Sequence, residues 1–274
     1  MRALWLRIKA GHAGSLDPLA TGMLPICLGE ATKVAGEMVA ARKRYLFTVA
    51  LGSSTASGDA EGPVSATAPV PPLEWPAVEA VLAGFLGLQQ QIPPMYSALK
   101  RAGEPLYRLA RAGVIVEREA RAIELSELKL LGLTPQTLEL EALCSKGTYI
   151  RVLAQDIAAR LGTLGHVTAL RRLYVEPFER EPMQTLETLA AERARGAWPA
   201  LLPPDLALAG LPAVHLAADE SRRVQQGQHV VVAASSACGR VRLYGEAGSF
   251  LGIGVADGCG GVQPRRLLVP LGSG

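Results

Sequence analysis

Cysteine is scarce in this sequence. Its 274 residues include four cysteines, Cys27, Cys144, Cys238 and Cys259. No two of them form a C-x-x-C pair, and none is spaced with a histidine as a zinc site requires. The low count in a chain of this length excludes a disulfide scaffold and favours a reduced, cytoplasmic protein.

Long apolar runs are missing as well. A membrane-spanning helix needs about 18 to 20 consecutive apolar residues, and Asp205 and four prolines interrupt the apolar stretch 198–218. The N-terminal sequence MRALWLRIKAG lacks the longer apolar segment and the small-residue cleavage site of a signal peptide. We therefore expect no association with a membrane.

The motifs of several large enzyme classes are also absent. The sequence contains no Walker A, G-x-G-x-x-G, H-E-x-x-H or G-x-S-x-G pattern. The sequence therefore contains no motif evidence for four enzyme classes: nucleotide hydrolases, hydride-transferring dehydrogenases, zinc hydrolases and hydrolases with a nucleophilic serine on a strand-to-helix turn. We expect neither a cofactor nor a metal.

What is present is the composition of a folded protein. Hydrophobic residues make up 49% of the chain and charged residues 19%. A chain of this length buries about 70–75% of its unfolded surface, which is enough for a stable core without disulfide bonds. The formal net charge of +3 permits binding to nucleic acid but does not by itself indicate it.

Hydrophobic periodicity and glycine or proline punctuation predict an α+β fold. The expected helices are 30–41, 75–86, 148–161 and 219–225, and residues 2–9 resemble the end of a further helix. The expected strands are 23–28, 44–51, 123–131, 137–143, 166–175, 229–233, 240–244, 250–256 and 265–269. The segment 52–62, GSSTASGDAEG, is expected to be a loop because of its glycine and serine content.

A domain boundary is expected between residues 198 and 212, where four prolines disfavour helices and strands. The sequence thus predicts a main domain over 1–208 and a small β-rich module over 209–274.

Asp17 is the first candidate for chemistry. Pro18 follows it and pushes its backbone toward extended geometry, and Gly14 would let a ligand approach the backbone closely. A carboxylate in such a loop can act as a nucleophile if a cation keeps it ionised. The alternative is that Asp17 only begins an ordinary Asp-Pro turn.

The second candidate is the segment 144–162, CSKGTYIRVLAQDIAARLG. Thr148 is expected to cap the helix, which places Tyr149 and Arg151 at the corner between a strand and a helix. Arg151 could then pair with a carboxylate through two hydrogen bonds, and Tyr149 could present its ring to a base or a sugar. The alternative is an ordinary helix start with a solvated arginine.

Two further features suit contact with nucleic acid. Tyr45, in KRYLF, could stack on a base, although a strand tyrosine more often fills the core. The segment 91–121 carries six Lys or Arg, three Glu and two tyrosines. That mixture suits an RNA-binding surface, with a solvated amphipathic face as the alternative.

Isolated charges are harder to assign. Lys33 and the neighbours Arg171 and Arg172 could contact phosphates or could equally be exposed charges. His12 could donate to a phosphate or wedge into a base stack, and the alternative is a hydrogen bond within its own loop. The residues alone therefore indicate an α+β protein of two domains that binds RNA.

Several long motifs occur in a fixed order: GHAGSLDPLATGMLPICLGEATK, KRYLF, GDAEG, QIPPMYSALK, CSKGTYIRVLAQDI and GHVTALRRL. They resemble the TruB-type tRNA pseudouridine synthases over residues 9–174, and the tail ending in GVQPRRLLV resembles a small PUA-type RNA-binding domain. The resemblance implies a mixed, mainly antiparallel sheet with flanking helices, followed by a C-terminal PUA-like β domain.

The resemblance also implies a reaction, the isomerisation of uridine 55 in the T loop of tRNA to pseudouridine. The base is flipped out of the loop for this chemistry, and no cofactor takes part. Asp17 matches the family's nucleophilic aspartate, Arg151 would pair with it, and Tyr45 would stack on the uracil.

The remaining roles follow from the same resemblance. Tyr149 would help to enclose the base, Leu170 would line the pocket, and Asp59 would buttress Arg151. His12 would fill the gap that the flipped base leaves, and Lys33 is taken as a phosphate contact. The segment 91–121 corresponds to the mobile insertion that clamps the T arm, so the expected partner is tRNA. No protein partner is expected to be required, and a monomer is expected.

The resemblance leaves alternatives open. The family normally begins with a strand and a K-P-x-G-x-[ST] motif, which are not found before Gly11, so one alternative is a truncated, catalytically impaired protein that binds or folds tRNA. A guide-RNA-directed synthase is another, although DPLATGMLPICLGEATK and the segment 91–121 favour the stand-alone type. A glycosidase would need a second acid near Asp17, for which Asp59 is the candidate.

Overall fold

The chain forms two compact units, each assembled from separate stretches of sequence. The computed structural model describes residues 8–101, 103–233 and 235–268. The first unit comprises Met1–Gly14, Pro25–Val39 and Glu176–Gly274, and the second comprises Ser15–Leu24 and Ala40–Val175. The loop that holds Asp17 therefore belongs to the same unit as the long central strands.

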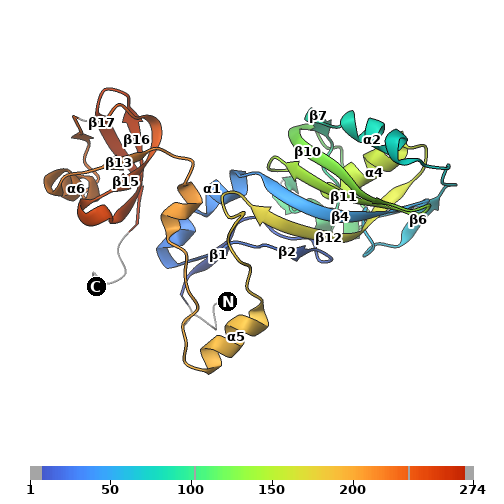
Figure 1. Ribbon diagram of the computed structural model, residues 1–274, viewed down its shortest axis with the longest axis horizontal. Helices are drawn as coiled ribbons and strands as arrows, with labels where there is room; N and C mark the ends of the chain where they lie inside the picture. Colours follow the sequence, from blue (N-terminus) through green and yellow to red (C-terminus); the bar gives the residue numbers. More distant parts are fainter. Residues whose placement is uncertain (1–7, 102, 234, 269–274) are drawn as a thin grey trace. The chain divides into compact units, whose positions relative to one another are not determined.

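A six-stranded sheet in the order β2-β12-β4-β11-β10-β7 forms the centre of the second unit (Figure 1). Its strands are β2 (Thr21–Gly22), β4 (Lys43–Leu51), β7 (Gly87–Gln91), β10 (Arg121–Leu133), β11 (Thr137–Cys144) and β12 (Gly165–Val175). Neighbouring strands are antiparallel except for β2, which runs parallel to β12. The expectation of a mixed, mainly antiparallel sheet is confirmed.

Two helices, α2 (Trp75–Ala83) and α4 (Ile150–Arg160), cover this sheet and also contact each other (Figure 1). Both have an apolar stripe at helical spacing, and its burial against the alternating apolar positions of the strands supplies the core. Residues of that core that are at most 2% exposed include Phe47, Val49, Leu125, Leu138, Leu140, Leu153 and Ile157.

The basic segment 91–121 is an excursion between β7 and β10, two strands that pair with each other. It contains β8 (Lys100–Arg101), β9 (Glu104–Pro105) and α3 (Leu106–Arg111). The sheet is therefore complete without it, and the segment stands as an addition to the fold.

The first unit carries two smaller sheets. β1 (Ala10–His12) pairs with β3 (Ile26–Leu28), followed by the 3₁₀ helix η1 (Gly29–Lys33) and α1 (Ala35–Ala40). After α5 (Leu186–Ala194) and the 3₁₀ helix η2 (Pro204–Leu208), a five-stranded sheet follows in the order β13-β15-β16-β17-β14. Its elements are β13 (Ala213–His215), α6 (Ala218–Gln225), β14 (Val230–Val231), β15 (Cys238–Tyr244), the 3₁₀ helix η3 (Glu246–Gly248), β16 (Phe250–Asp257) and β17 (Gly261–Leu267).

Some expected elements differ from the observed ones. The expected loop 52–62 includes β5 (Ser53–Thr55), which pairs with β6 (Val64–Thr67), because small polar residues are tolerated in a short hairpin at the surface. The expected strand 23–28 is reduced to Ile26–Leu28, since Pro25 cannot donate to a ladder. The expected helix 30–41 divides into η1 and α1.

Other expectations concern the ends and the surface. The expected helical residues 2–7 lie outside the described residues, and the two that follow, 8 and 9, are not helical. Among the helices that the structure describes, none has the length and apolar character needed to cross a membrane.

Candidate active site

Asp17 occupies the first position of a tight turn. The amide of Ala20 donates to the carbonyl of Asp17 at 2.9 Å, with Pro18 at the second position of the turn, where its fixed φ is favoured. The expected Asp-Pro turn is therefore present, and it engages the backbone of Asp17 but not its carboxylate. That carboxylate is 35% exposed and faces Arg151.

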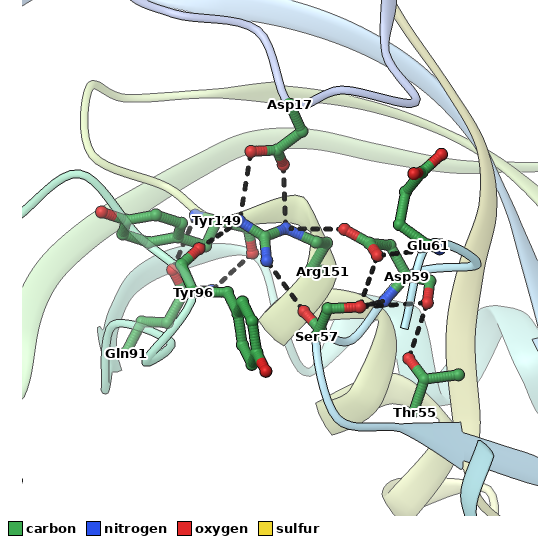
Figure 2. Close-up of polar contacts among 9 residues, drawn as sticks. All are labelled: Asp17, Thr55, Ser57, Asp59, Glu61, Gln91, Tyr96, Tyr149 and Arg151. Carbon is green, nitrogen blue, oxygen red and sulfur yellow. Dashed lines mark hydrogen bonds and ion pairs between the residues drawn. The ribbon is translucent and has the colours of Figure 1, made fainter. Parts of the chain in front are cut away.

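Arg151 binds Asp17 through two hydrogen bonds. Its Nε donates to Oδ2 of Asp17 at 2.8 Å and its Nη2 to Oδ1 at 3.1 Å (Figure 2). Nη1 donates to the carbonyl of Ser57, and Nη2 donates to that of Tyr96, each at 2.8 Å. The guanidinium, in a side chain only 4% exposed, is therefore fixed from several sides and presents one edge to the carboxylate.

Asp59 is a second carboxylate beside Arg151, and it contacts the same Nε atom as Asp17. Its Oδ2 lies 3.5 Å from Nε of Arg151, and both side chains are 4% exposed. Its Oδ1 accepts hydrogen bonds from the Ser57 hydroxyl and, at 3.1 Å, from the amide of Glu61 (Figure 2). The backbone on either side of Asp59 bonds to Val167 of β12, so the carboxylate is held to the sheet.

The strand-to-helix corner has the predicted position but a different cap. β11 ends at Cys144 and α4 begins at Ile150, with Tyr149 as the N-cap residue. The expectation that Thr148 caps the helix is wrong, because its hydroxyl donates to the carbonyl of Ser145 at 3.0 Å.

The backbone of Tyr149 is held instead by Gln91, the last residue of β7. The amide of Tyr149 donates to Oε1 of Gln91 at 2.8 Å, and Nε2 of Gln91 donates to the carbonyl of Tyr149 at 3.1 Å. Figure 2 shows Gln91 and Tyr149 on the same side of the guanidinium. This reciprocal pair fixes the residue from which the Tyr149 ring projects.

A pocket of about 110 Å³ lies beside the Asp17 carboxylate. Its walls include Tyr45, Tyr149 and Leu170 together with Asp17 itself, and the complete lining also contains Ser15, Leu16, Ala20, Thr148 and Ile150. Burial raises the pKa of both the Tyr45 and the Tyr149 phenol. The two rings therefore stay neutral at neutral pH and offer aromatic faces to a planar ligand.

The two adjacent arginines of β12 have different surroundings. Arg171 is exposed, and Arg172 is 1% exposed, with its Nε donating to the carbonyl of Met23 at 2.6 Å. The expectation that Arg172 is either a phosphate contact or an exposed charge is wrong, because successive strand residues point to opposite faces and Arg172 takes the inner one.

His12 and Lys33 belong to the other unit. His12 is an exposed residue of β1, opposite Ile26 of β3. Lys33, at the end of η1, directs its ammonium to Glu30 and, at 2.8 Å, to the carbonyl of Leu267. Within the described residues, no group of three or more His, Cys, Asp or Glu side chains is arranged to hold a metal ion.

Ser57 and Gln91 belong to this arrangement but were not among the residues predicted for it. Ser57 had a local indication, because a serine hydroxyl often bonds the backbone two residues further on, as that of Ser57 does with Asp59. Gln91 had none, since its importance depends on how β7 and α4 meet in space.

Comparisons with known proteins match the whole order of motifs. Residues 2–150 match the family described as TruB family pseudouridylate synthase (N terminal domain). Residues 151–208 match the tRNA pseudouridylate synthase B C-terminal domain, and residues 212–268 match Pseudouridine synthase II TruB, C-terminal.

Individual relatives cover almost the entire chain. It is 47% identical over 270 residues to tRNA pseudouridine synthase B of Chromohalobacter salexigens, covering 98% of this chain and 88% of that protein. It is 46% identical over 267 residues to tRNA pseudouridine synthase B of Aromatoleum aromaticum, covering 97% and 86%.

Solved structures show the same fold at much lower identity. A crystal structure of a Cbf5-Nop10-Gar1 complex matches with a TM-score of 0.74 at 22% identity, over 98% of this chain and 79% of that one. An H/ACA RNP bound to a substrate RNA containing 2′-deoxyuridine matches with a TM-score of 0.74 at 21% identity and the same coverage.

Proposed function

The chain belongs to the TruB family of pseudouridylate synthases and forms pseudouridine in tRNA, and from this premise we propose that its target is uridine 55 of the T loop and that Asp17 is the nucleophile. The reaction breaks the N1–C1′ bond of the nucleoside, turns the uracil over and joins C5 to C1′. A proton leaves C5 and one is gained at N1, so the product is an isomer and no co-reactant is consumed.

The observation that carries the proposal is the double role of the Asp17 carboxylate. It lines the pocket, and it forms two hydrogen bonds with the nearly buried Arg151. A carboxylate aimed by a fixed guanidinium and still 35% exposed is arranged to meet a substrate atom rather than to stabilise the core alone.

The walls of the pocket support a base flipped out of its stack. Extrusion costs a few kcal/mol, which stacking on an aromatic ring offsets. We propose that Tyr45 stacks on the uracil, that Tyr149 and Leu170 enclose it, and that Asp59 fixes Arg151.

Contacts to the rest of the RNA are assigned to other parts of the chain. We propose that the segment 91–121 clamps the T arm and that His12 fills the gap left by the flipped base. A lysine has three N–H donors, and we propose that one donor of Lys33 reaches a phosphate.

The proposed roles divide the chain into two domains. We propose a catalytic domain over 1–208 and a PUA-like RNA-binding module over 209–274, a range that includes the five-stranded sheet β13-β15-β16-β17-β14. We further propose that the protein is a monomer and that it is cytoplasmic, the latter in keeping with four cysteines that form no disulfide.

The decisive experiment measures tritium release from a T-arm stem-loop that carries a single 5-tritiated uridine, because joining C5 to C1′ expels the C5 hydrogen. We expect release when the label is at position 55 and none when it is elsewhere in the loop. Asp17→Asn should bind the stem-loop and release nothing, and Asp156→Asn, an exposed change on α4, should match the unaltered protein. Binding without release by the unaltered protein would instead support a tRNA-binding or tRNA-folding protein.

A further inference from the structure

Arg172 is the largest side chain that is fully buried among the described residues. Transfer of a guanidinium from water to the protein interior costs free energy unless hydrogen-bond acceptors surround it. The groups that Arg172 contacts therefore indicate its role. It lies on β12, directly opposite Tyr45 of β4 in the antiparallel register. Directly opposed residues on neighbouring strands share a face, so Arg172 and Tyr45 can interact side by side.

One contact of Arg172 holds the strand that follows the Asp17 turn. Its Nε donates to the carbonyl of Met23, and the Met23 amide donates back to the carbonyl of Arg172 at 2.8 Å. Just before Met23, Gly22 has φ +99, and a Cβ there would lie 2.1 Å from the carbonyl oxygen of Arg172. Only glycine therefore allows β2 to come this close to β12.

The other contact of Arg172 is with the Tyr45 phenol. Burial raises the pKa of Tyr45 most, and the charge and hydrogen bond of Arg172 lower it. The other groups that act on the phenol are Cys144 of β11 and Asp17, both of which raise its pKa. Of the groups among the described residues that act on the Tyr45 phenol, Arg172 is thus the one cation, and the Tyr45 ring lines the pocket.

We propose that Arg172 is a positioning residue for the reaction at Asp17, fixing both the Tyr45 ring and the strand that follows the Asp17 turn. Arg172 is not part of the pocket lining, so it acts through these two neighbours. The inference rests on the proposed function, in which Tyr45 supports the base while Asp17 attacks. A misplacement of about 1 Å in such a constellation can cost about a hundredfold in rate.

The test compares Arg172→Gln and Arg172→Lys with Arg160→Lys, a matched change at an exposed arginine of α4. Four quantities are measured: the thermal midpoint, the Kd for the T-arm stem-loop, the single-turnover rate of tritium release, and the absorbance titration of the Tyr45 phenol. The phenol of Tyr45 is isolated by subtracting the titration of Tyr45→Phe.

We expect Arg172→Gln to lower the single-turnover rate by roughly tenfold to a hundredfold, the range for losing a hydrogen bond from a charged donor. The Kd should change by less than about twofold, and the Tyr45 phenol should deprotonate at higher pH. Arg172→Lys should restore most of the phenol titration, because it keeps the charge, but not the rate, because an ammonium cannot reproduce the planar donor set. Arg160→Lys should change none of the four.

Several results would overturn the inference. One is an unchanged rate in the folded Arg172→Lys protein, which decides the matter if Arg172→Gln does not fold. Another is a phenol titration in Arg172→Gln identical to that of the unaltered protein. If the unaltered protein releases no tritium, the proposed function fails, and the phenol titration still tests whether Arg172 acts on Tyr45.

Discussion

Asp17 and Arg151 are 134 residues apart in the chain, and two hydrogen bonds of 2.8 and 3.1 Å join their side chains (Figure 2). The pair is asymmetric, because the carboxylate is 35% exposed and the guanidinium only 4%. The arginine therefore serves as the fixed partner, and the aspartate as the one that a substrate can reach.

Replacing Arg151 should damage stability and activity together. Arg151→Met leaves the buried side chain of Asp59 as a charge without its cation. Breaking a buried pair in this way costs about 3–5 kcal/mol. We expect urea unfolding at pH 7 to show a loss of that size, with tritium release abolished. Arg160→Met on the same helix should lose less than about 1 kcal/mol, and an equal loss in both variants would mean that burial of the pair is unimportant.

Gln91 should contribute more to stability and to the reaction rate than Gln90, its neighbour on β7. Gln91→Ala removes both hydrogen bonds to the backbone of Tyr149 and leaves its amide unsatisfied, whereas its carbonyl still accepts from the amide of Leu153. An unsatisfied group costs about 1–3 kcal/mol when it is buried. We expect a lower thermal midpoint and a lower single-turnover rate. Gln90→Ala, an exposed change, is the control, and equal effects of the two would refute the role given to Gln91.

Glu127 should add a pH-dependent contribution to stability. Hydrogen bonds from Lys129 and Arg44 lower the pKa of Glu127 from 4.5 to about 2. A carboxylate with a depressed folded-state pKa stabilises the protein above its unfolded value of 4.5, and the contribution is lost as the pH falls toward about 2. Because the Glu127 side chain is 34% exposed, we expect only about 0.5–1 kcal/mol. Urea unfolding of Glu127→Gln should show this deficit at pH 7 and a shrinking one below pH 4.5; a constant deficit would contradict the assignment.

Binding of the T-arm stem-loop should weaken steeply with salt. Exposed cations of the segment 91–121 include Lys100, Arg101, Arg108, Arg111 and Arg121. A protein that neutralises 6–10 phosphates loses about 10³–10⁵ in affinity between 50 and 200 mM salt. Arg108→Gln should reduce the slope of log Kd against log salt by about 1, and Arg160→Gln should leave it unchanged. A Kd independent of salt would remove the RNA-clamping role from this segment.

The sequence was most informative where periodicity and motif order agree. The long strands β4, β11 and β12 and the helices α2 and α4 were predicted within a few residues, because each buries one face against the common core. The turn at Asp17 followed from Asp-Pro alone. The pairing of Asp17 with Arg151, by contrast, came from resemblance, because no local pattern connects residues so far apart.

What the sequence did not indicate depends on contacts between elements. Gln91 is important only because β7 ends beside the start of α4. Two adjacent arginines in a strand point to opposite faces, so one of Arg171 and Arg172 had to face inward. Charged residues are rarely buried completely, which makes the exposed alternative the natural expectation.

The contacts that complete the active site all join distant parts of the chain. Those of Arg151 with Ser57 and of Arg172 with Met23 span 94 and 149 residues, beside the 134 of the pair at Asp17. During synthesis on the ribosome, the Asp17 carboxylate emerges early, and its partner Arg151 follows only with α4. Arg172, which holds Met23, follows later still with β12. A chain that stops before α4 therefore lacks the guanidinium that orients the carboxylate proposed as the nucleophile. Chemistry on RNA begins only when almost the whole central sheet has been made.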